Sequence, residues 1–166
     1  MGRDNAFLDA AADRVMIKDL LGRYAWALDH GPAAAWAGAF TPDGIFEAPN
    51  LGFRVAGRAK LIEFANDVYR TMPNAHHLMT NIVIDVSGDE ASGRCALNVF
   101  VALPDAVYAA LQGWYEDDYV FDGVQWRIRH RRAYLVEPQA MGMGKMGEYF
   151  RGFSVAAAKY ATSAAP

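Results

Sequence analysis

Two adjacent histidines are the side chains of this chain best suited to acid–base chemistry. His76 and His77 stand at the head of an apolar, β-branched run within residues 74–85, and such a run is typical of a strand. Because consecutive side chains of a strand point to opposite faces, at most one of the two imidazoles can face a cavity that this strand lines.

A carboxylate near the end of the first expected helix could orient that imidazole. Asp29 precedes Gly31 and Pro32, where Gly can cap a helix and Pro prevents its continuation. The helix dipole disfavours a negative charge at this end, so Asp29 needs a partner. A carboxylate that accepts a hydrogen bond from one ring nitrogen raises the basicity of the other, which makes such a pair a competent general base in an apolar pocket. A solvated carboxylate and a core histidine are the alternative interpretation.

Further side chains could assist this base. Tyr24 lies five residues before Asp29 and could hold a carbonyl oxygen or a leaving group, or it could be a core tyrosine. Arg131 and Arg132 face opposite ways on the last expected strand, so one of them could offer a forked donor to an oxyanion, although exposed strand charge is the usual explanation. Four more residues are expected to line, shape or polarise a substrate cavity, namely Phe46, Asn81, Asn98 and Trp114.

Composition and missing motifs exclude several functions. A net charge of −3 without a long basic run argues against nucleic acid as a partner. The single cysteine, Cys95, leaves no disulfide framework and no cysteine-based zinc site within one chain. Adjacent histidines diverge, so His76, His77 and Asp29 do not make a three-ligand metal site. The sequence contains no phosphate-binding Gly loop and no dinucleotide fingerprint, and we expect no cofactor.

The order of the expected elements predicts an α+β fold in one domain. Helices come first and long strands follow, and long strands favour a strongly bent, mostly antiparallel sheet with bulges. Three helices of the N-terminal half on its concave side would enclose a pocket. The expected helices cover residues 9–29, 32–40 and 58–72, with short strands over 45–48 and 53–57 and long strands over 76–86, 90–103, 108–121 and 124–136.

The ends of these elements follow from turn signals. Residues 41–44 read Thr-Pro-Asp-Gly and predict a turn before the first strand. We expect a single domain over residues 1–140 and a C-terminal segment over 141–166 that is either a pocket lid or a tail. Within that segment, the Met- and Gly-rich residues 141–147 are expected to be flexible, and a weak helix follows. No basic-then-apolar leader and no membrane-length apolar run occur, so a cytoplasmic protein is the default expectation.

In this order of motifs the chain resembles the SnoaL-like branch of the nuclear-transport-factor-two-like superfamily, over about residues 10–137. This branch includes scytalone dehydratase, bile-acid 7α-dehydratase and lindane dehydrochlorinase. The motifs that carry the resemblance are YAWALD at 24–29, FTPDG at 40–44, HLMTN at 77–81, GWYED at 113–117 and GVQWRIRHR at 123–131.

The resemblance implies a cone-shaped α+β barrel, often a homotrimer, whose C-terminal segment closes the pocket. These enzymes pair an Asp at the end of the first helix with a His about 48 residues later, which selects His77 over His76 because His77 follows Asp29 by 48 residues. The resemblance also assigns catalytic roles to Tyr24 and Arg131. A second catalytic histidine of scytalone dehydratase has no obvious counterpart here.

Together these inferences predict a cofactor-free lyase of the dehydratase type. Its substrate would be an apolar, hydroxylated small molecule, aromatic or polycyclic, and the protein would form a homo-oligomer, with a trimer favoured and a dimer possible. The same base could instead cleave a carbon–carbon bond, as in deformylation of a diaryl diol, or act in an isomerase or cyclase. A role of another class is a non-catalytic ligand-binding module or the small subunit of a ring-hydroxylating oxygenase.

Overall fold

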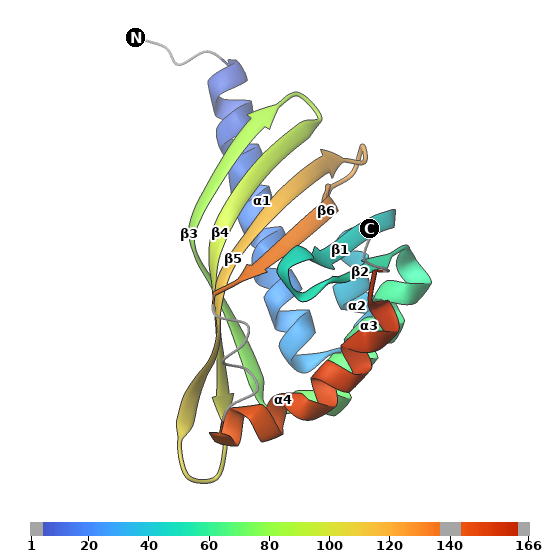
Figure 1. Ribbon diagram of the computed structural model, residues 1–166. Helices are drawn as coiled ribbons and strands as arrows, with labels where there is room; N and C mark the ends of the chain where they lie inside the picture. The colour runs from blue at the N-terminus through green and yellow to red at the C-terminus, as the bar shows by residue number, and fades with distance from the viewer. Residues whose placement is uncertain (1–4, 137–143, 163–166) are drawn as a thin grey trace.

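A curved sheet of six strands forms one layer of the protein, and helices pack against one of its faces (Figure 1). The structure is a computed structural model that describes residues 5–136 and 144–162. The strands are β1 (Phe40–Ala48), β2 (Phe53–Ala56), β3 (Ala75–Ser87), β4 (Glu90–Ala102), β5 (Val107–Phe121) and β6 (Trp126–Leu135).

The sheet is open and mostly antiparallel. Its order is β2-β1-β6-β5-β4-β3, and only the pair β1–β6 is parallel. Strands β2 and β3 lie at the two edges, so the sheet curves without closing. The α+β class and the curved, mostly antiparallel sheet are therefore confirmed.

Three helices of the N-terminal half pack on this sheet and on one another, as the sequence predicts. Helix α1 lies along β3, while α2 packs against α3, and a C-terminal helix, α4, packs on the outside of α3 (Figure 1). None of the described helices combines the length and the apolar character that crossing a membrane requires. The helices are α1 (Asn5–His30), α2 (Ala33–Gly38), α3 (Arg58–Thr71) and α4 (Gly144–Ala157), with 3-10 turns η1 (Pro49–Leu51) and η3 (Ala158–Tyr160).

Helix α1 ends where a glycine can adopt a left-handed conformation. Ile17, Leu21, Tyr24 and Leu28 recur at helical spacing and are all buried, which holds one face of α1 against the core. Gly31 has φ 72° and donates its N–H to the carbonyl of residue 27 at 2.8 Å, so it caps the helix at a fixed point. This point determines where Asp29, the next-to-last helical residue, is presented.

The long strands bend at register shifts, as their length predicts. One shift lies between Thr80 and Val83 in the pairing of β3 with β4, and another follows Val99 in the pairing of β4 with β5. Asn81 occupies the first shift with φ 53°, a left-handed conformation that Asn tolerates better than most residues. Such bulges insert an unpaired residue and increase local bending, which gives the sheet its curvature.

Three predicted boundaries are wrong. Strand β1 begins at Phe40, because residues 41–44 form an irregular stretch of this strand in its pairing with β6, not a turn before it. A Cβ atom at Gly44 would lie 2.7 Å from the Cβ of Phe40, so only glycine allows this close approach. Helix α1 starts earlier than expected, at Asn5. Residues 144–147, expected to be flexible, belong to α4, and residues 141–143 lie outside the described part of the chain.

Candidate active site

The structure brings Asp29 and His77 together. The end of α1 lies beside β3, and the carboxylate of Asp29 meets His77 twice. Its Oδ1 lies 2.6 Å from Nδ1 of His77, and its Oδ2 accepts the backbone N–H of the same residue at 2.9 Å. The side chains of His77 and Asp29 are 7% and 8% exposed, so solvent screens this contact little. The carboxylate at the C-terminal end of α1 thus has two donors that offset its unfavourable position.

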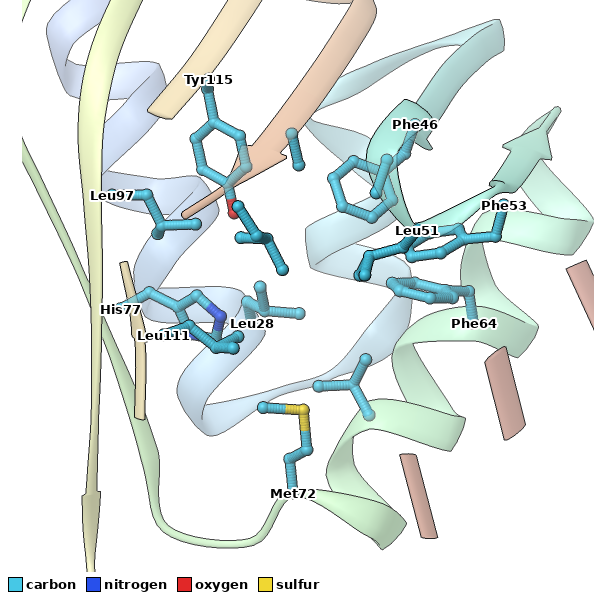
Figure 2. Close-up of a pocket in the computed structure, with 14 residues that line it drawn as sticks. Leu28, Phe46, Leu51, Phe53, Phe64, Met72, His77, Leu97, Leu111 and Tyr115 are labelled. Carbon is cyan, nitrogen blue, oxygen red and sulfur yellow. The ribbon is translucent and has the colours of Figure 1, made fainter. Parts of the chain in front are cut away.

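This geometry determines which ring nitrogen is free. Asp29 accepts from the backbone N–H of His77 and lies beside its Nδ1, so the neutral form of the imidazole is held with its hydrogen on Nδ1 and its lone pair on Nε2. Figure 2 shows the imidazole of His77 directed into a cavity. His76 points to the other face of β3, where it is exposed and lies near the ring of His30, with 5.8 Å between the ring centroids.

The cavity beside His77 is narrow and apolar. It has a volume of about 50 Å³ and is enclosed by side chains from α1, α3 and the inner face of the sheet (Figure 2). Of the described residues that line it, only His77 and Tyr115 carry polar side chains, while the others are aliphatic, aromatic or thioether groups. We name this space the inner cavity. A base in such surroundings acts without competition from bulk water.

Tyr115 supplies the second polar group of the inner cavity. It lies on β5, where its residue is 3% exposed, and its hydroxyl is directed toward the cavity (Figure 2). Burial raises the pKa of Tyr115 well above its ordinary value, and the neighbouring Tyr24 adds to this while the charge of Arg131 opposes it. The hydroxyl of Tyr115 therefore stays protonated at neutral pH and can donate a hydrogen bond.

Arg131 lies behind this tyrosine, away from the cavity wall. Its guanidinium carbon is 4.1 Å from the ring centroids of both Tyr24 and Tyr115, so it contacts both rings. Two of its nitrogens donate to the two carboxylate oxygens of Asp117, each at 2.7 Å, and the side chains of both partners are fully buried. The guanidinium is thus already paired with a carboxylate of its own chain.

Tyr24 also lies behind the cavity wall. Burial raises its pKa, and its hydroxyl is near Arg131, Trp36 and Tyr115 without forming a hydrogen bond of good geometry among the described residues. Its ring packs against the rings of Trp36, Phe40 and Tyr115. Tyr24 thus contributes an aromatic contact to Arg131 and to Tyr115, and it does not line the inner cavity.

The four expected substrate-binding residues do not share one place. Phe46 lines the inner cavity and is 7% exposed. Asn81 is exposed at the bulge of β3, and Asn98 is half-buried on the face of β4 opposite to Leu97, which does line the cavity. Trp114 is 41% exposed on the outer face of the sheet. The register shifts decide which residues face inward, and the sequence does not show where these shifts fall.

Tyr115 is the residue that sequence reasoning missed in favour of its neighbour Trp114. One signal could have found it. Asp117 follows Tyr115 by two residues, so both point to the same face of β5. A carboxylate on an inward face needs a buried cation, and Arg131 on the neighbouring strand supplies it. Among the described residues, no three His, Cys, Asp or Glu side chains lie close enough together to hold a metal ion.

Comparisons with known proteins agree with this fold. The family model described as a SnoaL-like domain matches residues 9–132. An uncharacterized protein of Mycobacterium tuberculosis is 31% identical over 132 residues, which cover 77% of this chain and 90% of that protein. A solved structure of an Asp-to-Asn variant of another M. tuberculosis protein, of unknown function, is 27% identical with a TM-score of 0.84 and covers 95% of this chain and 96% of its own.

Two more distant structures share the fold alone. A candidate scytalone dehydratase from Novosphingobium aromaticivorans is 23% identical with a TM-score of 0.65, over 76% of this chain and 85% of its own. The β subunit of a candidate aromatic-ring-hydroxylating dioxygenase from the same organism is 21% identical with a TM-score of 0.63. The match covers 80% of this chain and 92% of that subunit. Proteins with this fold thus carry two different functional descriptions, so the function of this chain has to be argued from its site and not from its fold.

Proposed function

The chain belongs to the SnoaL-like family, and on that premise we propose that it is a cofactor-independent lyase of the dehydratase type. Its substrate would be an apolar, hydroxylated small molecule. The observation that carries this proposal is the contact of His77 with Asp29, in which Nδ1 is held by the carboxylate and Nε2 is left free at an apolar cavity. A general base needs this combination of an orienting acceptor and a free lone pair.

The proposed reaction is an elimination of water. Nε2 of His77 removes a proton from the carbon next to the one that bears the hydroxyl group. The electron pair of that C–H bond forms the double bond while the C–O bond breaks, and the departing hydroxide takes the proton back from the imidazolium and leaves as water. The hydroxyl of Tyr115 would donate a hydrogen bond to the substrate oxygen on which negative charge develops.

In this proposal Arg131 and Tyr24 are positioning residues. Both are packed against the ring of Tyr115 and neither lines the inner cavity, so each would act through Tyr115. The role expected for Arg131, direct stabilisation of charge on the substrate, would require it to leave Asp117, and an unpaired buried carboxylate is costly.

Other reactions use the same base. Removal of a proton from an alcohol instead of from carbon would lead to carbon–carbon cleavage, as in deformylation of a diaryl diol, and isomerisation or cyclisation also begins with deprotonation. The second candidate of another class is a non-catalytic ligand-binding module or oxygenase small subunit. The small volume of the inner cavity, about 50 Å³, favours the oxygenase small subunit, which needs no substrate cavity of its own. Cytoplasmic location stays a prediction from the sequence.

A model reaction tests the base directly. In the Kemp elimination of 5-nitrobenzisoxazole, a base removes a carbon-bound proton and the N–O bond breaks to give a coloured phenolate. We expect the wild-type protein to accelerate this reaction, with His77→Gln and Asp29→Asn each losing about 100-fold, the low end of the usual contribution of proton transfer. His76→Gln is the matched control, because that imidazole is exposed on the other face of β3, and it should keep full activity.

The contrary outcomes are equally specific. Equal rates for wild type and His77→Gln would show that the acceleration does not come from this imidazole. A normal rate for Asp29→Asn would show that the carboxylate does not orient the base. Circular dichroism and thermal unfolding of each variant would show that the fold is retained.

A further inference from the structure

A second cavity adjoins the inner cavity on the side of the loop between α3 and β3. We name it the outer cavity. It is lined by the end of α1, including Asp29 and His30, by Tyr69 of α3, and by the first residues of β3, including Ala75. Its volume is about 380 Å³. This cavity takes no part in the elimination proposed above.

The two cavities share a wall. Leu28, Val68 and Met72 line both of them, so these three side chains separate the inner cavity from the outer one. Asp29 lines the outer cavity while its partner His77 lines the inner one, which places the outer cavity directly beside the proposed catalytic pair.

The volumes of the two cavities show that the inner cavity alone is too small to hold a drug-sized molecule. At about 50 Å³ it has room for a few water molecules or roughly a single ring, since one water needs about 10–15 Å³ measured in this way. Cavities that bind drug-sized molecules usually measure about 300–1,000 Å³. The outer cavity lies in this range at about 380 Å³.

Met72 is the part of the shared wall that can move at the lowest cost. Leu28 and Val68 lie within α1 and α3 and are fixed by their helices, whereas Met72 follows the last residue of α3 and has non-helical dihedrals of φ −129° and ψ 57°. Its side chain is directed into the cavity (Figure 2). An unbranched thioether with three rotatable bonds can change rotamer without displacing the backbone.

We infer that the two cavities form one binding site for an elongated apolar molecule with a hydroxylated head, and that Met72 determines how long this molecule can be. The head lies against His77 in the inner cavity, and the tail passes Met72 into the outer cavity. The outer cavity has Asn74 and the exposed His30 at its edge, so the far end of the tail can carry a polar group. This inference rests on the proposed function for the orientation of the ligand.

Two phenols that differ only in the length of the tail test the inference. Binding of 4-ethylphenol and 4-heptylphenol is measured by isothermal titration calorimetry. Each buried methylene is expected to raise the affinity about fourfold, so wild type should bind the longer phenol at least 100-fold more tightly. Met72→Phe enlarges the dividing wall and Ala75→Leu fills the outer cavity, so each should weaken 4-heptylphenol at least tenfold. Ala75 lines only the outer cavity, so Ala75→Leu should change 4-ethylphenol less than twofold, whereas Met72→Phe, which also touches the inner cavity, should weaken 4-ethylphenol less than it weakens 4-heptylphenol.

Met16→Phe is the matched control, because Met16 is 41% exposed on α1 and lines neither cavity. The two test variants act from different elements, so the failure of one to fold leaves the other as the test. Affinity that does not rise with tail length in wild type, or a weakening of both phenols by the same factor in the variants, would overturn the inference. So would a wild-type protein that binds neither phenol.

The two proposals can fail separately. In His77→Gln the preference for the longer phenol should persist, because the tail contacts do not involve the imidazole. Retained base activity without length dependence would overturn the two-cavity site alone. Length dependence without base activity would overturn the general base alone.

Discussion

At the scale of single residues, the pair of Arg131 and Asp117 stands out because two charged side chains are buried in the core. Both side chains are fully buried, and each charge is compensated by the other through two hydrogen bonds of 2.7 Å. Burial acts to lower the pKa of Arg131, but the charge of Asp117 outweighs it and keeps the pKa well above the ordinary value. The guanidinium therefore remains charged, and its contacts with the rings of Tyr24 and Tyr115 replace part of the lost solvation.

Removing one partner of this pair should be costly. Arg131→Met leaves the carboxylate of Asp117 buried without its cation, so we expect a loss of about 3–5 kcal/mol in the free energy of unfolding. Arg129→Met is the matched control on the same strand, because Arg129 pairs with Glu90 at the surface, where such pairs contribute about 0–1 kcal/mol. Urea unfolding followed by circular dichroism measures both. Equal losses for the two variants would contradict the special cost of the buried pair.

At the scale of elements, a second buried carboxylate holds the C-terminal segment in place. Asp67 of α3 is 4% exposed and accepts from Lys159 at 3.0 Å and from Tyr160 at 3.1 Å, and Arg70 of its own helix also donates to it. The ring of Tyr160 packs edge-on against Phe64, which lines the inner cavity. We therefore propose that the described part of residues 141–166 forms an outer layer behind the cavity wall, in line with the lid alternative.

This attachment should depend on pH. Burial acts to raise the pKa of Asp67, but hydrogen bonds from Lys159, Arg70 and Tyr160 outweigh it and hold the pKa below the ordinary value of 3.8. A carboxyl group whose pKa is lower in the folded state stabilises the fold at pH values above its unfolded pKa, and this contribution is lost as the pH falls through the folded pKa.

Asp67→Asn should therefore destabilise the protein at pH 7 by about 2 kcal/mol, the usual size for hydrogen bonds to a charged group. The difference between wild type and variant should shrink as the pH falls below about 4, because wild type then protonates the same group. Unfolding in urea at pH 7, 4 and 3 measures this. Asp19→Asn serves as control, since its partner Arg23 is exposed; a difference for Asp67→Asn that stays constant across this pH range would contradict the mechanism.

The periodicity of apolar residues predicts most elements of this fold but not the faces of its long strands. Helix α3 and the long strands follow from spacing and turn signals to within a few residues. Trp114 and Tyr115 are both aromatic, and their alternation alone allows either one to face inward. Bulges set this choice through backbone pairing with β4, and pairing across strands is a tertiary property that one strand does not encode.

In the candidate site, too, some features can be predicted from the sequence and others cannot. A helix end and a strand start single out Asp29 and the pair His76 and His77 as candidates, but strand alternation shows only that one of the two histidines can face inward. The choice of His77 comes from the family resemblance, through its spacing of 48 residues from Asp29. The cavities cannot be foreseen in this way, because their walls come from segments far apart in the chain, such as Leu28 of α1 and Met72 after α3. Their volumes depend on packing at the level of single methyl groups.

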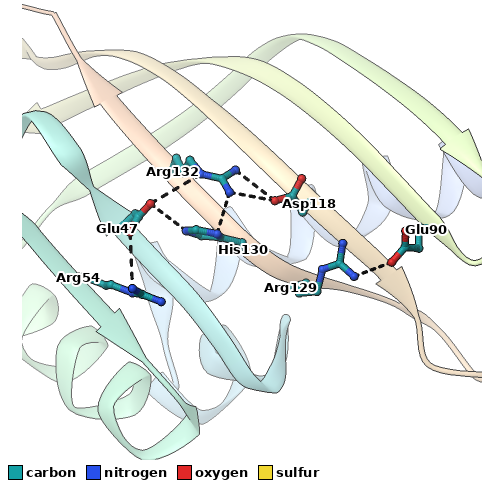
Figure 3. Close-up of polar contacts among 7 residues, drawn as sticks. All are labelled: Glu47, Arg54, Glu90, Asp118, Arg129, His130 and Arg132. Atoms are coloured by element: carbon teal, nitrogen blue, oxygen red, sulfur yellow. Dashed lines mark hydrogen bonds and ion pairs between the residues drawn. The ribbon is translucent and has the colours of Figure 1, made fainter.

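At the scale of the whole molecule, the outer face of the sheet combines charge with exposed apolar groups. Figure 3 shows Glu47 in contact with Arg54, His130 and Arg132, and Arg132 in contact with Asp118. These half-exposed pairs add little to stability and give the face a fixed pattern of charges instead.

Three large apolar side chains lie on that same outer face. Leu78 and Val83 of β3 are each 46% exposed, and Trp114 of β5 is 41% exposed and stacks on Tyr134. A broad apolar group that remains exposed on a sheet is typical of an interface between protein chains. The expected homo-oligomer, with a trimer favoured and a dimer possible, would use this face.

A single substitution tests this assembly. Trp114→Glu should convert the oligomer to monomer in sedimentation velocity, because it places a charge within the apolar contact. Val124→Glu is the control, since Val124 is 80% exposed in the hairpin between β5 and β6, and it should leave the mass unchanged. A wild-type protein that sediments as a monomer, or a Trp114→Glu variant that keeps the oligomeric mass, would exclude this interface.

The bulge at Asn81 has a consequence for how this architecture can vary. Before it, odd-numbered side chains of β3 such as His77 and Met79 turn inward, and after it even-numbered ones such as Ile82 and Ile84 do so. Omitting Asn81 would therefore leave every remaining side chain on its present side and would only straighten the strand. The curvature of this edge strand can thus change by the gain or loss of a single residue while the set of inward-facing side chains stays the same.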